Sequence, residues 1–240
     1  MGGRHQYALL SGALLAAALA AGASTWLEWL PCRGSMLSGS ILLDFQYPTD
    51  FTDACLARMD RSDAVPLAAG TLETRALSAL LLGLGWLGFA AGFRLPAALR
   101  AVVLLPVVPI SWFALEAWLA RESAALNEPG LTIGLIEVTA LLAAVVIIQR
   151  PAPGRARVAS LIGLWAVASY GLVHYVGDHL FMVAFSDANW DVPPGAGYPT
   201  AATIAVCALL VALLGWRVTH PGAGGRASVP VNASTPTVAG

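Results

Sequence analysis

The sequence contains no lysine and few charged side chains of any kind. Charged residues make up 11% of its 240 residues, whereas hydrophobic residues make up 58% and the mean hydropathy is +0.72. A soluble domain carries roughly 25% charged residues because water must solvate its surface. The scarcity of charge therefore excludes an ordinary soluble domain, and the net charge of −1 gives no reason to expect a nucleic-acid partner.

Several functional motifs are missing as well. The sequence has no CxxC pair and no cluster of cysteine and histidine, so a structural zinc site is not predicted. It has no GxSxG or HExxH motif, and the aspartates of segment 28–75 lack the spacing of a calcium-binding EF-hand. These absences argue against an enzyme, and they predict neither a cofactor nor a metal.

The amino-acid usage indicates a source and a location. All thirteen basic residues are arginine, and alanine, glycine and leucine are used heavily. We interpret this usage as that of a high-GC bacterial genome. Together with the hydropathy it predicts a multi-pass protein of the bacterial cytoplasmic (inner) membrane, with the lipid bilayer as its main partner.

Six apolar runs are long enough to cross a bilayer as helices, because about 20 residues at about 1.5 Å rise span a hydrocarbon layer about 30 Å thick. The runs lie at 7–27, 76–93, 98–119, 131–149, 158–182 and 200–217. They predict an all-α membrane protein with six transmembrane helices, in which residues 1–218 form one domain. Pro106 and Pro109 should kink the third run. Residues 219–240 should form a disordered cytoplasmic tail.

The positions of arginine predict the orientation, because positive charge concentrates in cytoplasmic segments. With the N-terminus inside, the cytoplasmic side holds Arg4, Arg94, Arg100, Arg150, Arg155, Arg157, Arg217 and Arg226. All fourteen acidic residues then lie outside or in the outer part of a span. Both termini are therefore expected in the cytoplasm, with residues 28–75 as a large extracytoplasmic loop.

The first run has a second interpretation. Arg4, an alanine- and leucine-rich stretch and the small residues 21–24 resemble a signal peptide with its cleavage site. The apolar run continues to Trp26 and Leu27, which is long for such a peptide, so we favour a retained span. Under either interpretation the loop that follows faces outside.

The loop 28–75 holds two of the three cysteines, Cys32 and Cys55. An oxidising compartment outside the membrane favours a disulfide over two free thiols. The bridge would close a loop of about 24 residues and stabilise the fold by on the order of 3 kcal/mol. A short helix is predicted around Cys55, with Asp50 as its N-cap and Met59 on the same face as Cys55. The loop is then either a small folded cap or a docking surface for another envelope protein.

Ionisable side chains within the spans are the other candidates, because charge is costly in hydrocarbon. Together with one tyrosine they are Glu116, Glu137, Tyr170, His174, Asp178 and His179. The helix rise places the ionisable groups at comparable levels in the outer third of the membrane. Tyr170, His174 and Asp178 recur every four residues and should form one stripe of the fifth run. His179 lies about 140° away from His174 around that helix.

Several interpretations of this polar cluster stay open. Hydrogen bonds between carboxylates and histidines could satisfy the groups and fix helix packing without any further role. The functional alternatives are a proton- or ion-handling site, a ligand pocket that opens outward, and a metal or haem site. Haem is disfavoured because only one run supplies histidines to the cluster. Glu137 and His174 could also act as acid and base, although no nucleophile motif accompanies them.

The sequence thus predicts, first, a non-enzymatic accessory, assembly or scaffold component of the bacterial cell envelope. It would act on the extracytoplasmic face and contact another envelope protein through loop 28–75. A small transporter or ion- and proton-handling protein that uses the outer Glu/His/Asp cluster is the alternative. An outward-facing membrane enzyme is the third hypothesis.

Overall fold

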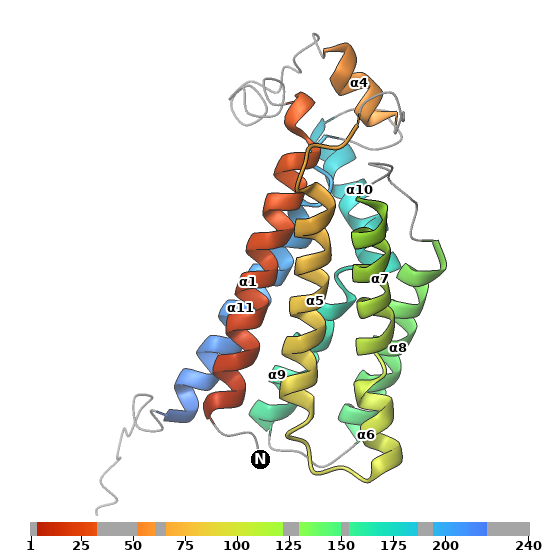
Figure 1. Cartoon of the computed structure of the whole chain (residues 1–240). Helices are drawn as coiled ribbons and strands as arrows, with labels where there is room; N and C mark the ends of the chain where they lie inside the picture. The colour runs from red at the N-terminus through yellow and green to blue at the C-terminus, as the bar shows by residue number, and fades with distance from the viewer. Residues whose placement is uncertain are drawn as a thin grey trace, which may run out of the picture.

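The computed structural model describes residues 4–32, 52–60, 66–121, 130–149, 154–186 and 194–219. All regular secondary structure within these ranges is helical, and the long helices pack side by side (Figure 1). A helix satisfies its backbone hydrogen bonds within one segment, which is what a chain surrounded by hydrocarbon requires.

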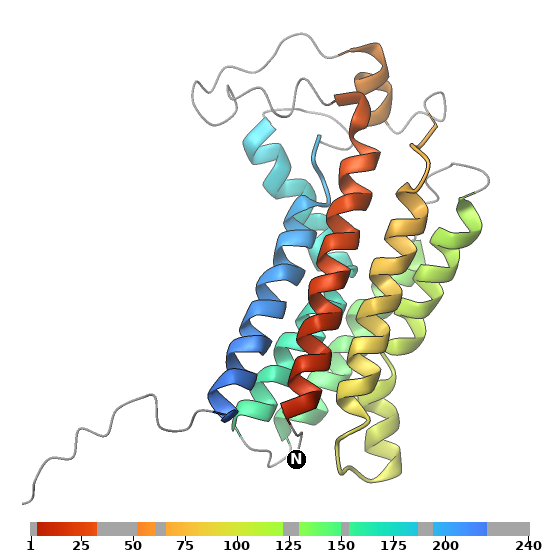
Figure 2. The ribbon, with the colours of Figure 1, turned by 60° about the vertical axis from the view of Figure 1, so that its left-hand side comes forward.

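The helices of the bundle are α1 Arg4–Glu28, α5 Thr71–Ala90, α6 Ala97–Leu104, α7 Val107–Ala120, α8 Gly130–Gln149, α9 Gly154–Ala168, α10 Leu172–Ser186 and α11 Tyr198–Thr219. Two short elements, the 3-10 helix η1 Leu30–Cys32 and α4 Asp53–Met59, lie together at one end of the bundle (Figures 1 and 2). We call this end the α4 end, and the end that holds the N-terminus the opposite end.

Four helical stretches are long and apolar enough to cross a membrane. They are α1, α6 together with α7, α8, and α11 up to Arg217. The pair α9 and α10 makes a fifth if the two helices are counted as one bent span. The prediction of a helical protein with several apolar spans is thereby confirmed for four to five candidate spans. Helix α5 also has 20 residues, but Glu73 and Arg75 in its first two turns lower its hydropathy.

Helix α1 packs mainly on α5 and α11, and small residues allow the close approach. A Cβ atom added to Gly85 of α5 would lie 2.7 Å from the Cβ of Ala13 in α1. One added to Gly215 of α11 would lie 2.8 Å from the Cβ of Tyr7. In the same core the indole of Trp86 is fully buried, and its Nε1–H donates to the backbone oxygen of Val103 at 2.9 Å.

Two of the spans are interrupted. The third breaks at Leu105 and Pro106, between α6 and α7, as the missing N–H of Pro106 leads one to expect. Pro109 lies within α7 and does not interrupt that helix. The fifth bends by 69° between α9 and α10. The run 158–182, which we expected to form one span, is therefore divided into two helices. Ser169 and Gly171 flank the bend, and such Gly/Ser pairs are a known cause of sharp kinks.

The predicted disulfide between Cys32 and Cys55 is confirmed. Cys55 and Met59 are fully buried on one face of α4, as expected from their spacing. The N-cap is Thr52, whose Oγ1 accepts a hydrogen bond from the backbone N–H of Cys55 at 3.2 Å. Asp50, which we expected in that role, lies outside the described residues. We call η1, α4 and the bridge between them the disulfide cap.

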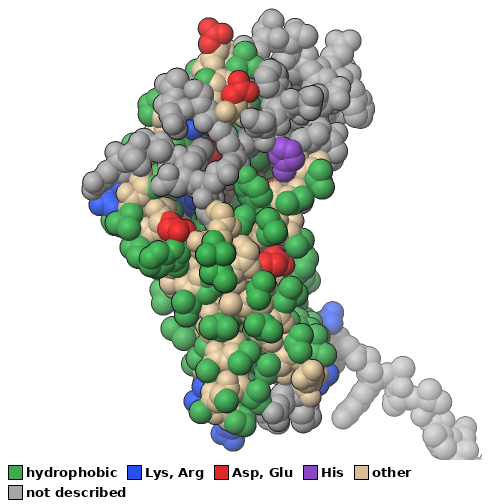
Figure 3. Space-filling model, turned by 90° about the vertical axis from the view of Figure 1, so that its right-hand side faces the viewer, with side chains coloured by type: hydrophobic (Ala, Val, Ile, Leu, Met, Phe, Trp, Pro, Cys, Tyr) green, Lys and Arg blue, Asp and Glu red, His purple; other side chains and the backbone are tan. Residues whose placement is uncertain are grey.

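Charge is distributed unevenly along the bundle. On the face shown in Figure 3, acidic side chains lie toward the α4 end and at mid-height, positive side chains lie toward both ends, and no acidic side chain is visible at the lower end. Because the sequence has no lysine, the positive charge at the opposite end is arginine. Arg155 lies there and donates to the backbone oxygen of Arg217 at 3.0 Å, which joins the start of α9 to the end of α11.

Candidate functional site at the bend between α9 and α10

The bend leaves backbone N–H groups at the start of α10 without partners in their own helix. One of these groups is the N–H of Val173, which donates a hydrogen bond to Oε2 of Glu137 in α8 at 3.4 Å. A carboxylate is favourable there, since the start of a helix carries partial positive charge. A Cβ atom at position 171 would collide with this carboxylate, so Gly171 is required for the contact.

Asp178 plays a similar part at the start of α11. The hydroxyl of Thr200 donates to Asp178 Oδ2 at 2.7 Å, and the backbone N–H of Thr200 donates to the same oxygen at 3.3 Å. The Thr200 hydroxyl also lies 3.4 Å from the backbone oxygen of Ser169 in the bend. The carboxylate of α10 is thus tied to the first turn of α11.

His174 lies one turn before Asp178 and is 8% exposed. Its ring meets the ring of Trp165 from α9 in an edge contact, with 4.6 Å between the ring centroids. Neither Nδ1 nor Nε2 of His174 forms a hydrogen bond within the described part of the chain. A buried polar group without a partner costs about 1–3 kcal/mol, which makes His174 the feature of the site that packing explains least.

Tyr170 lies in the bend itself, between the two helices, so it does not continue the helical stripe of His174 and Asp178. Its ring packs on Phe113 of α7 with 5.0 Å between centroids. His179 lies on α10, is partly exposed, and makes no hydrogen bond to another described residue. The side chains of Tyr170 and His179 therefore do not share the surroundings of His174.

Glu116 lies between α7 and α8. Its Oε1 accepts hydrogen bonds from the indole N–H of Trp112 at 2.7 Å and from the hydroxyl of Thr132 at 3.2 Å. Its Oε2 is buried and has no hydrogen-bond partner among the described residues. This carboxylate is accordingly held by its own pair of helices, away from the contacts of the bend.

The predicted polar residues share a level in the bundle, but the structure does not join them in one network. No hydrogen bond or ion pair links Glu116, Glu137 and His174 to one another in the ranges that the structure describes. No group of three or more His, Cys, Asp or Glu side chains is placed to hold a metal ion in those ranges either. Each carboxylate instead ties neighbouring helices together.

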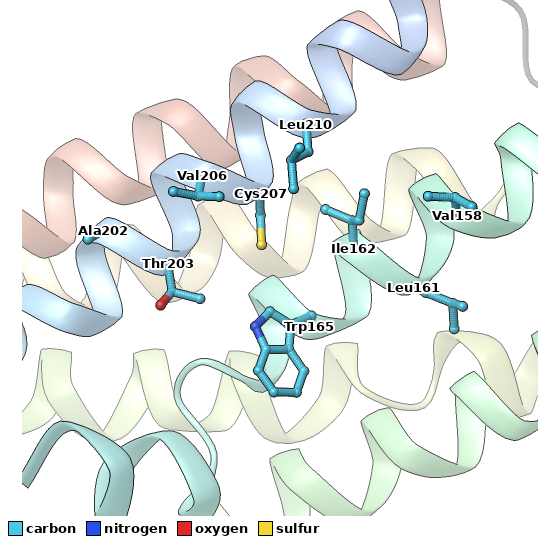
Figure 4. A pocket seen from close by; sticks show the side chains of 9 residues that line it. All are labelled: Val158, Leu161, Ile162, Trp165, Ala202, Thr203, Val206, Cys207 and Leu210. Carbon is cyan, nitrogen blue, oxygen red and sulfur yellow. The ribbon is translucent and has the colours of Figure 1, made fainter. Parts of the chain in front are cut away.

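The sequence did not reveal an apolar groove of about 610 Å³ between α9 and α11 (Figure 4). Its walls include Leu161, Ile162 and Trp165 of α9, and Thr203 and Val206 of α11. Every span is apolar around most of its circumference, so hydropathy could not show which faces leave a hollow between them.

The disulfide cap is anchored to the bundle. The indole N–H of Trp29 donates to the backbone oxygen of Ala196, before α11, at 3.0 Å. Glu28 and Arg75 join α1 to α5 by an ion pair of 2.6 Å just below the cap. Arg58 of α4 is buried, and its burial lowers the pKa of the guanidinium, while nearby Glu28 acts against that shift.

Comparison with known proteins gives no further indication. No protein-family model matches the chain, and neither a curated protein nor a solved structure shows significant similarity to it.

Proposed function

We propose that the chain crosses the bacterial inner membrane six times, with both termini in the cytoplasm, and serves as a non-enzymatic accessory or scaffold component of the cell envelope. The observation that carries the proposal is the disulfide cap, which is covalently closed and anchored to α1 and to the turn before α11. On this proposal the cap faces outward and presents α4 to another envelope protein.

The proposed topology rests on α5 and on charge. Helix α5 has 20 residues and lies between α1 and α7, so counting it with the four apolar stretches and the bent pair gives six crossings. Arginines such as Arg155 and Arg217 at the opposite end support a cytoplasmic location for that end. A disulfide at the α4 end fits an oxidising compartment.

The scaffold role is supported by the way α4 is held. Cys55, Arg58 and Met59 point inward and are buried, whereas Asp53 and Ala54 are exposed. A surface that is already fixed loses little conformational freedom when a partner binds it, so less of the binding energy is lost to ordering. The intramembrane carboxylates support the same role, because Glu116, Glu137 and Asp178 each make hydrogen bonds between helices.

Site-specific photo-crosslinking in cells tests this proposal. A photoreactive amino acid at Ala54, on the exposed face of α4, is expected to yield one discrete adduct with an envelope protein. Ala98, exposed near the start of α6 at the opposite end, is the matched control and should not yield that adduct. The proposal fails if Ala54 gives no adduct, or if both positions capture the same set of proteins.

His174 is the observation that favours the second candidate, a small transporter or an ion- or proton-handling protein. Ionisable side chains within membrane spans often mark ion or proton pathways, and His174 is such a side chain, buried and without a described partner. Purified protein in liposomes would then conduct protons or ions, and His174→Ala would abolish the flux while the protein still inserts. Absence of flux in the wild-type chain under a pH gradient would dismiss this candidate.

A further inference from the structure

The groove between α9 and α11 is apolar along most of its length and has unused hydrogen-bond donors at one end. Leu161, Ile162 and Val206 supply aliphatic walls. The indole nitrogen of Trp165 and the hydroxyl of Thr203 lie toward the end near the bend, on the two opposite walls of the groove (Figure 4). Neither group donates a hydrogen bond to another described residue.

His174 adds a second, independent observation at the same end. Its ring packs against the Trp165 ring, and it is more than nine-tenths buried with both nitrogens unpartnered in the described chain. The groove thus combines aliphatic walls with two hydrogen-bond donors, and one of these, Trp165, contacts an imidazole whose nitrogens have no partner in the described chain. A molecule with an aliphatic tail and an oxygen-bearing head fits this arrangement.

The depth of the polar end of the groove in the membrane indicates whether the head of the bound molecule is charged. Trp165 lies eleven residues after Gly154, the start of α9, and at 1.5 Å per residue this is about 16 Å along the helix. The polar end therefore lies within a hydrocarbon layer about 30 Å thick rather than at its cytoplasmic edge. A charged head is costly at that depth, and no arginine lines the groove to compensate it.

We propose that this groove binds an uncharged, lipid-soluble molecule with an aliphatic tail and a head that accepts hydrogen bonds through ketone oxygens, of the benzoquinone type. The tail lies along Ile162 and Val206, and Trp165 Nε1–H and the Thr203 hydroxyl donate to a head oxygen. The volume of about 610 Å³ is in the range of small-molecule sites in proteins, about 300–1,000 Å³. The site is separate from the disulfide cap and does not depend on the proposed scaffold role.

Equilibrium binding of a benzoquinone that carries a decyl chain, measured on the full chain in phosphatidylcholine nanodiscs, tests the proposal. Saturable binding at one site is expected. Trp165→Phe keeps the ring but removes the donor, and Thr203→Val removes the hydroxyl at constant shape. Since one hydrogen bond contributes about 0.5–1.5 kcal/mol, each variant should weaken binding about twofold to tenfold.

A blocking variant separates the groove from general partition into lipid. Ala202 is exposed and lines the groove, so Ala202→Phe should abolish saturable binding. Ala212 is exposed on the same helix outside the groove, and Ala212→Phe should bind like the wild type. Decanoate and phosphatidylglycerol, whose heads are charged, should not compete.

Three results would overturn the inference. One is binding that never saturates or that Ala202→Phe leaves intact, which would indicate partition into the bilayer. Another is wild-type affinity in both Trp165→Phe and Thr203→Val, which would remove the donors from the site. The third is competition by decanoate or phosphatidylglycerol at equal affinity, which would show that the groove takes charged lipid.

Discussion

Replacing His174 by phenylalanine is expected to stabilise the folded protein. The imidazole is 8% exposed, and neither ring nitrogen has a hydrogen-bond partner in the described chain. Such a group costs about 1–3 kcal/mol, because it has given up its hydrogen bonds to water. Phenylalanine has no polar atom to desolvate, and its ring can keep the edge contact with Trp165, a contact worth about 0.5–1.5 kcal/mol. The expected gain in the free energy of unfolding is therefore about 1–3 kcal/mol.

Thermal unfolding of the detergent-solubilised full chain measures this gain. For a chain of this length 1 kcal/mol shifts the midpoint by about 2–4 °C, so the His174→Phe midpoint should rise by several degrees. His179→Phe, on the same helix but partly exposed, should shift the midpoint little. A midpoint that falls in His174→Phe would refute the reasoning, because it would mean that the imidazole makes a stabilising hydrogen bond in the folded protein.

Three further substitutions test the contacts around the bend and the cap in the same melting assay. Thr200→Val removes the hydroxyl that donates to the Asp178 carboxylate at 2.7 Å and should cost about 1.5–3 kcal/mol. Gly171→Ala should cost about 1–3 kcal/mol because its Cβ would displace the α8 carboxylate, whereas Gly134→Ala, with nothing within 4 Å, should be neutral. Cys55→Ser should cost about 2–5 kcal/mol, and a reductant should lower the wild-type midpoint to that of the variant. A Gly171→Ala midpoint equal to that of Gly134→Ala, or a Thr200→Val or Cys55→Ser midpoint equal to that of the untreated wild type, would contradict the contact concerned.

Much of the fold could be predicted because the membrane restricts the choices. An apolar run must form a helix to satisfy its backbone, so hydropathy alone located α1, α8 and α11. The disulfide followed from two cysteines in one loop, and the break before α7 followed from the missing N–H of Pro106. Each of these features depends on local chemistry that a linear sequence displays.

The bend between α9 and α10 could not be predicted in the same way. No proline stands between Val158 and Met182. Serine and glycine, which occur here as Ser169 and Gly171, are common in membrane helices that do not bend. What holds the bend is Glu137 of another helix, more than thirty residues earlier in the sequence. The N-cap of α4 shows the same limit at short range, because Thr52 and Asp50 are both good capping residues and only the backbone path selects one.

Helix rise predicts a depth for a polar residue, but it does not predict the direction in which the side chain points. Helix rise gave Glu116, Glu137 and His174 comparable levels, which suggested one shared site. Direction depends on how each helix is rotated against its neighbours, and the structure turns Glu116 toward Thr132 and Glu137 toward the start of α10. A carboxylate in hydrocarbon accepts hydrogen bonds from the nearest donors. Once one pair of helices supplies those donors, the carboxylate gains little from a contact with a third helix. His174 differs because neither of its nitrogens has a hydrogen-bond partner in the described chain, whereas Glu116 has one bonded oxygen and one without a partner. A buried side chain whose polar atoms all lack a described hydrogen-bond partner, rather than charge at a common level, therefore marks one place among the predicted polar residues, which is the contact of His174 with Trp165 beside the groove.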